Sequence, residues 1–177
     1  MIQNNKAANR YAKAFFVQTK ENHELEKTLK DCQLILKTLV QEKELLGILK
    51  NPTVSKVSKI SVLTKIFKSH LQALTLNFLR LVINRGREGL LQFILEEFVR
   101  LYNLEKNIIV VELFTTTPLS PELKESIKKK VSLTADVRLV EKIDKSLIGG
   151  FIINRGDKQY DASIRKKIRN TKRVFKV

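Results

Sequence analysis

Three aspartates near the C-terminus, Asp144, Asp157 and Asp161, have the residue type and the spacing that acid–base catalysis could use. Two carboxylates in one cleft can divide the roles of general acid and general base. Each of these aspartates, however, occupies a position typical of a turn or of a helix cap. We therefore interpret all three as structural residues, and we expect no catalytic residue among them.

The two histidines and the single cysteine, His23, His70 and Cys32, are the other candidates for chemistry. A lone cysteine excludes an intramolecular disulfide, and so small a set makes a metal cluster improbable. Both histidines belong to the part of the chain with helical periodicity, away from any nucleophile elbow. Cys32 is in helical phase with a stripe of leucines, which predicts a buried side chain. We expect no metal, no cofactor and no enzymatic activity.

The paired glycines Gly149 and Gly150 could suggest a phosphate-binding loop. They lie inside an apolar segment and are not followed by the Lys-Ser/Thr of a P-loop. Paired glycines in a strand more often permit a bulge or the close approach of another backbone. We predict that these two glycines are structural.

The net charge of +16 favours an acidic partner, nucleic acid or an anionic surface. The basic residues of the last segment meet no acid after Asp161. Single-strand binders interleave basic residues with exposed stacking aromatics, whereas aromatics here total 7% and fall mostly at core positions. A basic nucleic-acid-binding module remains the alternative function, and a solvated lysine-rich surface is a third explanation of the charge.

Helical periodicity dominates residues 1–105. In the fourth helix Val57, Ile60, Leu63 and Phe67 share one phase and should face inward. The six predicted helices cover residues 6–20, 22–41, 42–50, 54–69, 71–84 and 88–104. Short helices with tight links predict a six-helix bundle.

Strand periodicity begins after residue 106. The pattern predicts strands at 108–114, 137–143 and 147–153, the last of them buried and followed by a hairpin turn at 154–157. A helix should span 121–131, and Asp161 or Ser163 should cap a final basic helix. The predicted fold class is therefore mainly α, a six-helix bundle over 1–105 followed by a small α+β domain over 106–177.

The first and fifth helices carry more apolar surface than one core face needs. The first adds a small-residue face of Ala7, Tyr11 and Ala14, and the fifth is apolar on two faces. Such a pair could form a groove for an amphipathic partner helix. The alternative, that both faces of each helix pack inside the bundle, stays open.

Several motifs, in order along nearly the whole chain, resemble the F-type ATP synthase delta subunit family, whose mitochondrial members are the oligomycin-sensitivity-conferring proteins. The matching segments are Arg10 to Phe16, Asn77 to Val82, Arg85 to Arg87, Pro118 to Ser120, Ile143 to Phe151, Gly156 to Asp157 and Asp161 to Ile164. Gly149, Gly150, Asp161 and Ser163 belong to the C-terminal part of this signature.

The resemblance implies a non-catalytic stator adaptor that couples rotary proton transport to ATP synthesis. Its N-terminal domain should bind alpha subunits of the head, and its C-terminal domain the b subunit of the peripheral stalk. The implied groove for the alpha N-terminus comprises Tyr11, Ala14, Phe15, Leu76, Leu79 and Ile83. We expect one copy per complex and no nucleic acid. The first residues lack a secretory h-region, so we expect a peripheral protein on the cytoplasmic face of a bacterial inner membrane.

Overall fold

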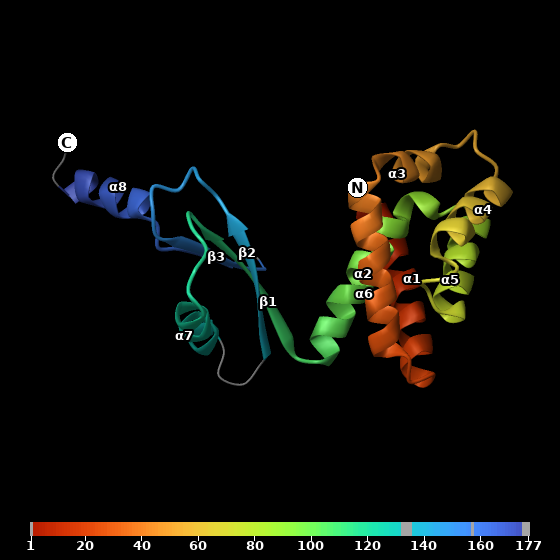
Figure 1. Cartoon of the computed structure of the whole chain (residues 1–177), viewed down its shortest axis with the longest axis horizontal. Coiled ribbons are helices and arrows are strands. Elements are labelled where there is room, and N and C mark those ends of the chain that lie inside the picture. Colours follow the sequence, from red (N-terminus) through yellow and green to blue (C-terminus); the bar gives the residue numbers. More distant parts are fainter. Residues whose placement is uncertain (1, 132–135, 157, 175–177) are drawn as a thin grey trace. The chain divides into compact units, whose positions relative to one another are not determined.

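The computed structural model describes residues 2–131, 136–156 and 158–174. The chain divides into two compact units, Met1–Tyr102 and Asn103–Val177. The first is helical and the second contains the sheet, as Figure 1 shows by colour.

The N-terminal unit contains the helices that the apolar periodicity predicts, with ends shifted by a few residues. A 3₁₀ turn, η1, precedes the last of them. The elements are α1 (Ile2–Glu21), α2 (Leu25–Gln41), α3 (Lys43–Lys50), α4 (Lys56–Phe67), α5 (Ala73–Asn84), η1 (Glu88–Leu90) and α6 (Leu91–Glu105).

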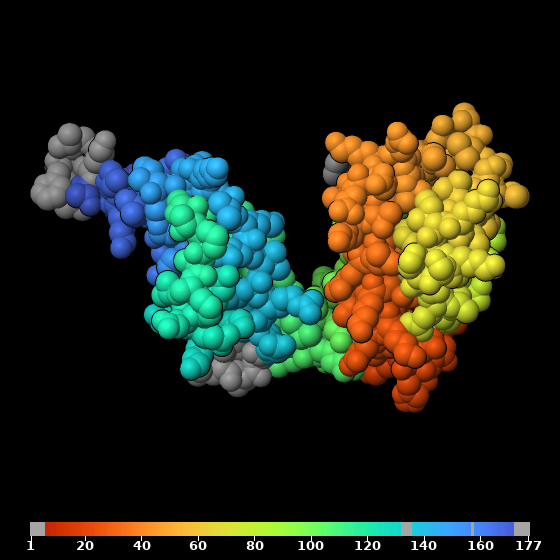
Figure 2. Space-filling model, in the orientation of Figure 1, coloured from red at the N-terminus to blue at the C-terminus, as the bar shows by residue number. Residues whose placement is uncertain are grey.

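One continuous hydrophobic core fills this unit, and its helices pack closely (Figure 2). Aromatic rings mark its centre: Phe15 of α1 stacks on Phe78 of α5 with centroids 3.9 Å apart, and lies 5.1 Å from Phe98 of α6. Cys32 is fully buried, as predicted. Burial, reinforced by the negative charge of Asp31, raises the pKa of its thiol, so Cys32 behaves as a small apolar side chain.

The inward face of α4 differs from the predicted one at its first turn. Val57 is 78% exposed, whereas Lys59 is only 2% exposed. Leu63 and Phe67 are buried as expected. The apolar periodicity predicted the wrong buried residue here because Lys59 forms an ion pair with Glu88, which is distant in sequence. This partner makes the burial of a charged side chain tolerable.

The end of α5 follows the sequence signal at Arg85-Gly86. Gly86 adopts φ 64°, and its N–H donates to the Ile83 carbonyl at 2.8 Å. The N–H of Arg87 donates to the Val82 carbonyl at 3.0 Å. This is a Schellman motif, which needs a residue with left-handed φ after the helix.

The C-terminal unit is built on a four-stranded sheet of order β2-β1-β3-β4. β1 pairs with β2 in parallel and with β3 antiparallel, and β3 pairs antiparallel with β4. A parallel pair needs a crossover connection, and α7 supplies it. The elements are β1 (Ile108–Thr115), α7 (Pro121–Val131), β2 (Asp136–Ile143), β3 (Phe151–Arg155), β4 (Lys158–Asp161) and α8 (Ile164–Val174).

The predicted buried strand over 147–153 was wrong at its start. β3 begins only at Phe151, and it is half-buried. The left-handed φ of 80° at Gly150 interrupts extended backbone there. The predicted hairpin is confirmed, because β3 and β4 pair antiparallel around Gly156. Asp157, predicted in this turn, lies outside the described residues.

Candidate partner-binding site

The stack between Phe15 and Phe78 fixes which side of α1 faces outward. Ala8, Ala12 and Phe15 are buried on the inner face. Ala14 is exposed and Tyr11 is half-buried on the adjoining face. Small and half-buried side chains on an exposed helix face allow another backbone to approach closely.

This face of α1 forms one wall of a shallow surface depression. The depression is lined by Ala7, Arg10, Tyr11, Lys13, Ala14 and Arg87. It therefore joins two segments far apart in sequence, Arg10 to Phe16 and Arg85 to Arg87. Three cationic side chains border it, so the depression favours a partner that combines an apolar face with carboxylates.

The predicted groove residues divide into two groups. Tyr11 and Ala14 line the depression. Leu76 is half-buried and packs against the core, but it does not line this depression. Phe15, Leu79 and Ile83 are each only 1% exposed and belong to the core.

The prediction that these three residues line the groove is corrected, because their burial places them in the core. Leu79 and Ile83 are buried because α5 packs on more than one side, as the alternative interpretation of its two apolar faces allowed, whereas Phe15 of α1 is buried where it stacks on Phe78. The basic residues Arg10, Lys13 and Arg87 were absent from the predicted groove. All three nevertheless belong to the motifs that carried the resemblance, and this could have drawn attention to them.

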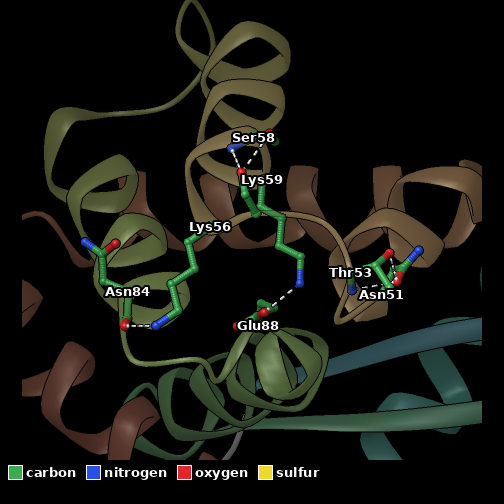
Figure 3. Close-up of polar contacts among 8 residues, drawn as sticks. Asn51, Thr53, Lys56, Ser58, Lys59, Asn84 and Glu88 are labelled. Carbon is green, nitrogen blue, oxygen red and sulfur yellow. Dashed lines mark hydrogen bonds and ion pairs between the residues drawn. The ribbon is translucent and has the colours of Figure 1, made fainter.

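Polar contacts at both ends hold α5 in place. At its start, Asp31 of α2 accepts hydrogen bonds from the Gln72 N–H at 3.0 Å and the Thr75 hydroxyl at 2.6 Å. At its end, the Lys56 ammonium donates to the Asn84 carbonyl at 2.9 Å (Figure 3). A carboxylate at the N-terminus and a cation at the C-terminus both complement the helix dipole.

A buried ion pair holds the segment that carries Arg87. Lys59 Nζ lies 2.6 Å from Glu88 Oε1, and the two side chains are 2% and 14% exposed (Figure 3). Burial on its own would raise the pKa of Glu88, but the hydrogen bond and the charge of Lys59 outweigh it and lower the pKa. Glu88 stays ionised at neutral pH, and α4 is thereby tied to the chain next to the depression.

The signature residues of the C-terminal unit meet at the start of α8. The Ile164 N–H donates to the Gly149 carbonyl at 3.0 Å. A Cβ on Gly150 would collide with the Ala162 carbonyl oxygen, so this position requires glycine. Ser163 caps α8 by accepting from the Lys166 N–H at 3.2 Å.

The aspartates of this unit have turn roles. Asp161 accepts a hydrogen bond from the Ser163 N–H at 2.9 Å, and Asp144 accepts one from the Ser146 N–H at 2.8 Å. Hydrogen bonding by Ser163 and by Ser146, respectively, lowers the pKa of each carboxyl. Both are therefore acceptors that stabilise loops, as the sequence predicted.

Neither metal ligation nor membrane insertion is indicated by the part of the chain that the structure describes. Within it, no three His, Cys, Asp or Glu side chains come together as a metal site would require. No helix in the same part combines the length and the apolar character that a membrane crossing needs.

A helical unit with a cation-bordered depression, followed by a small α+β unit in which Asp144 and Asp161 stabilise turns, is an arrangement suited to a structural protein that binds partners. The model of the family described as ATP synthase delta (OSCP) subunit matches residues 7–175. The chain belongs to this family. It is therefore a structural, non-catalytic component of an ATP synthase.

Individual relatives agree with this assignment. The ATP synthase subunit delta of Christiangramia forsetii is 33% identical over 177 residues, which cover 99% of this chain and 96% of the relative. That of Prochlorococcus marinus is 33% identical over 162 residues, which cover 90% of each chain. A chain of the Toxoplasma gondii mitochondrial ATP synthase hexamer has the same fold, with a TM-score of 0.73 at 23% identity over 96% of this chain and 97% of that one.

Proposed function

We propose that the chain is the stator adaptor of an F-type ATP synthase, linking the catalytic head to the peripheral stalk. In this role it holds the head still while rotary proton transport drives ATP synthesis. The observation that carries the proposal is the depression on α1, an exposed small-residue face with cations at its border. An adaptor needs slow dissociation at both ends and no chemistry of its own.

The N-terminal unit binds the N-terminal segment of an alpha subunit as an amphipathic helix. Ala14 permits close approach of that helix, and Tyr11 offers a half-buried ring for its apolar side. Arg10, Lys13 and Arg87 pair with its carboxylates. Leu76 is half-buried, so only its exposed part can add to the contact with the alpha helix.

The C-terminal unit binds the end of the b subunit of the stalk. One adaptor serves one complex, so the chain does not act as a homo-oligomer. It is held peripherally at the cytoplasmic face of a bacterial inner membrane, through its partners. The resemblance of the C-terminal signature and the strongly basic α8 support this part of the proposal.

The substitution Ala14→Asp tests the head-binding site. It places a carboxylate where the partner helix approaches most closely, and there the loss of its hydration and its repulsion of the partner's own carboxylates together cost about 3 kcal/mol. We expect the affinity for a peptide of the cognate alpha N-terminus to fall roughly a hundredfold in calorimetric titration. The free protein should keep its melting temperature, because position 14 is exposed and Arg10 lies one helical turn away.

Val17→Asp is the matched control, because Val17 is 53% exposed on the same helix and does not line the depression. It adds the same charge and should leave the affinity within about threefold. If both variants bind like the wild type, the alpha helix docks elsewhere. If the wild type binds neither the alpha peptide nor the b subunit, the adaptor function itself is wrong.

A further inference from the structure

α8, the last helix of the C-terminal unit, leads away from the sheet, and beyond its first turn no other described element runs alongside it (Figure 1). Two contacts hold its start. The Ile164 N–H donates to the Gly149 carbonyl at 3.0 Å, and the Arg165 guanidinium donates to the Ser146 carbonyl at 2.6 Å. Of the described side chains of α8, only that of Lys166 is half-buried and the rest are exposed. The helix is therefore open to solvent along most of its length.

The apolar side chains of α8 have no described cover. Isolated helices of about this length are marginal in water, and most protein helices are stabilised by the packing of an apolar face. Ile164 and Ile168 lie four positions apart and so share one side of the helix. They are 41% and 44% exposed. This isoleucine stripe would stabilise the helix if it packed on a further surface.

Cations lie on both sides of the isoleucine stripe. At 3.6 residues per turn, Arg165 and Arg169 fall on one side of it and Lys167 on the other. α8 contains six Lys and Arg residues and no Asp or Glu. The sequence has no acid after Asp161. A helix with an apolar stripe between cationic flanks is typical of segments that lie on anionic lipid surfaces.

A lipid surface fits α8 better than a protein or a nucleic acid does. A single helix that stands out from its unit is convex and gives a partner helix no groove to enter. A bilayer adapts to a convex shape and accepts an apolar stripe at the boundary of its headgroups and acyl chains, while long Lys and Arg side chains reach the lipid phosphates. Nucleic acid would pair the cations but leave the isoleucines exposed, and α8 has no described aromatic side chain for stacking.

We propose that α8 binds the surface of an anionic lipid membrane directly, with Ile164 and Ile168 at the boundary of headgroups and acyl chains and its cations on lipid phosphates. The proposal goes beyond the adaptor function, in which the chain reaches the membrane only through its partners. Each Lys or Arg near an anionic surface raises the affinity about fivefold. This attraction compensates for the narrowness of the isoleucine stripe.

Cosedimentation of the full-length chain with lipid vesicles tests the proposal. Vesicles of phosphatidylcholine and phosphatidylglycerol in equal parts provide the anionic surface, and vesicles of phosphatidylcholine alone provide the neutral one. We expect binding to the mixed vesicles at about 0.1 M salt. Binding should be at least about tenfold weaker on the neutral vesicles, and weaker by a similar factor on the mixed vesicles at about 0.5 M salt.

Two variants separate the apolar contribution from the electrostatic one. Ile168→Ser keeps every charge and should weaken binding at least about fivefold, because less apolar surface leaves water. Lys167→Glu/Arg169→Glu should weaken it at least about 25-fold, from fivefold at each position. Lys129→Glu/Lys130→Glu in α7 is the matched control, because it makes the same change of charge at exposed positions outside α8. It should bind within about threefold of the wild type, and circular dichroism should show all variants folded.

The other outcomes would overturn the proposal while the adaptor function stands. Equal losses in the α7 and α8 double variants would show that net charge, and not α8, attracts the chain to lipid. Full binding by Ile168→Ser would exclude the isoleucine stripe from the contact. Failure of the wild type to bind the mixed vesicles would leave α8 to an acidic protein. Tighter binding to a single-stranded oligonucleotide than to the vesicles, insensitive to Ile168→Ser, would assign α8 to nucleic acid.

Discussion

The rings of Phe15 and Phe78 lie face to face, 3.9 Å between centroids and 6° from parallel. This contact joins α1 directly to α5 at the centre of the core. Ala14, the neighbour of Phe15 in sequence, is exposed at the depression. The stability of the unit and its proposed binding face are therefore set by adjacent residues that point in different directions.

Phe15→Ala should destabilise the N-terminal unit by about 3–5 kcal/mol, because it removes a fully buried ring and leaves a cavity. Ala14→Asp should change the free energy of unfolding by less than about 1 kcal/mol. Urea denaturation followed by circular dichroism at 222 nm measures both. A large loss of stability in Ala14→Asp would mean that position 14 belongs to the core.

Asp31→Ala should destabilise the same unit by about 2–3 kcal/mol. It leaves the Gln72 N–H and the Thr75 hydroxyl without their shared acceptor at the start of α5. Thr75→Val, which removes only one of the two hydrogen bonds, should cost less. Hydrogen exchange of the first α5 amides should accelerate in Asp31→Ala. Unchanged protection there would show that α5 does not depend on this contact.

Glu88→Gln should cost about 3 kcal/mol at neutral pH, because it leaves the buried Lys59 ammonium without a counter-charge. The pKa of Glu88 is lowered from 4.5. The stabilisation is therefore present above pH 4.5 and is lost as the pH falls through the lowered value. The difference in unfolding free energy between wild type and Glu88→Gln should shrink as the pH falls below 4.5.

The double variant Lys59→Met/Glu88→Leu serves as the control for this pair. Replacing both charges by apolar side chains of similar size should cost far less than removing one of them. Denaturant titrations of the wild type, the single variant and the double variant over pH 3 to 7 provide the comparison. A double variant as unstable as Glu88→Gln would indicate that packing at this position, and not charge, accounts for the loss.

Gly150→Ala should destabilise the C-terminal unit more than Gly156→Ala. Both glycines have positive φ, at 80° and 55°, so alanine strains the backbone at both. Only at Gly150 would the added Cβ collide with backbone, the Ala162 carbonyl. We expect the difference to be about 1–3 kcal/mol. Hydrogen exchange of the β1 amides reports it, and equal effects would show that the strands adjust around Gly150.

The alternative of a nucleic-acid-binding module is tested with labelled oligonucleotides at physiological salt. We expect no sub-micromolar binding, because the basic α8 carries no described aromatic side chain on which bases could stack. Sub-micromolar binding with a steep salt dependence, lost when residues 162–177 are removed, would support the alternative.

The helices were predictable from the sequence because their apolar periodicity is local. The polar contacts between helices were less predictable, because they join residues far apart in the chain. The periodicity assigned Val57 inward, but the ion pair of Lys59 with Glu88, 29 residues away, reverses that assignment. Asp31 gave no sign that it would hold α5, because its partners lie more than 40 positions later in the chain.

The candidate site was predictable in part for a related reason. Sequence patterns show that α5 is apolar on two sides, but they cannot tell a central helix from one that exposes a face. Only the packing shows that Leu79 and Ile83 are in the core. Gly149 and Gly150 were interpreted as structural from their residue type. The start of β3 was predicted too early, because the apolar residues over 147–153 gave no indication of the turn at Gly150.

The position of β1 has a mechanical consequence. β1 is the first strand after α6, and it lies between β2 and β3 within the sheet. It pairs with β2 along its whole length, from Ile108↔Asp136 to Thr115↔Ile143. In the proposed stator role, tension between a partner of the helical unit and a partner that holds β2 or β3 would enter at Ile108 and pull along the strand axis, across the hydrogen bonds of β1. Those bonds would share the load in shear and would not open one after another.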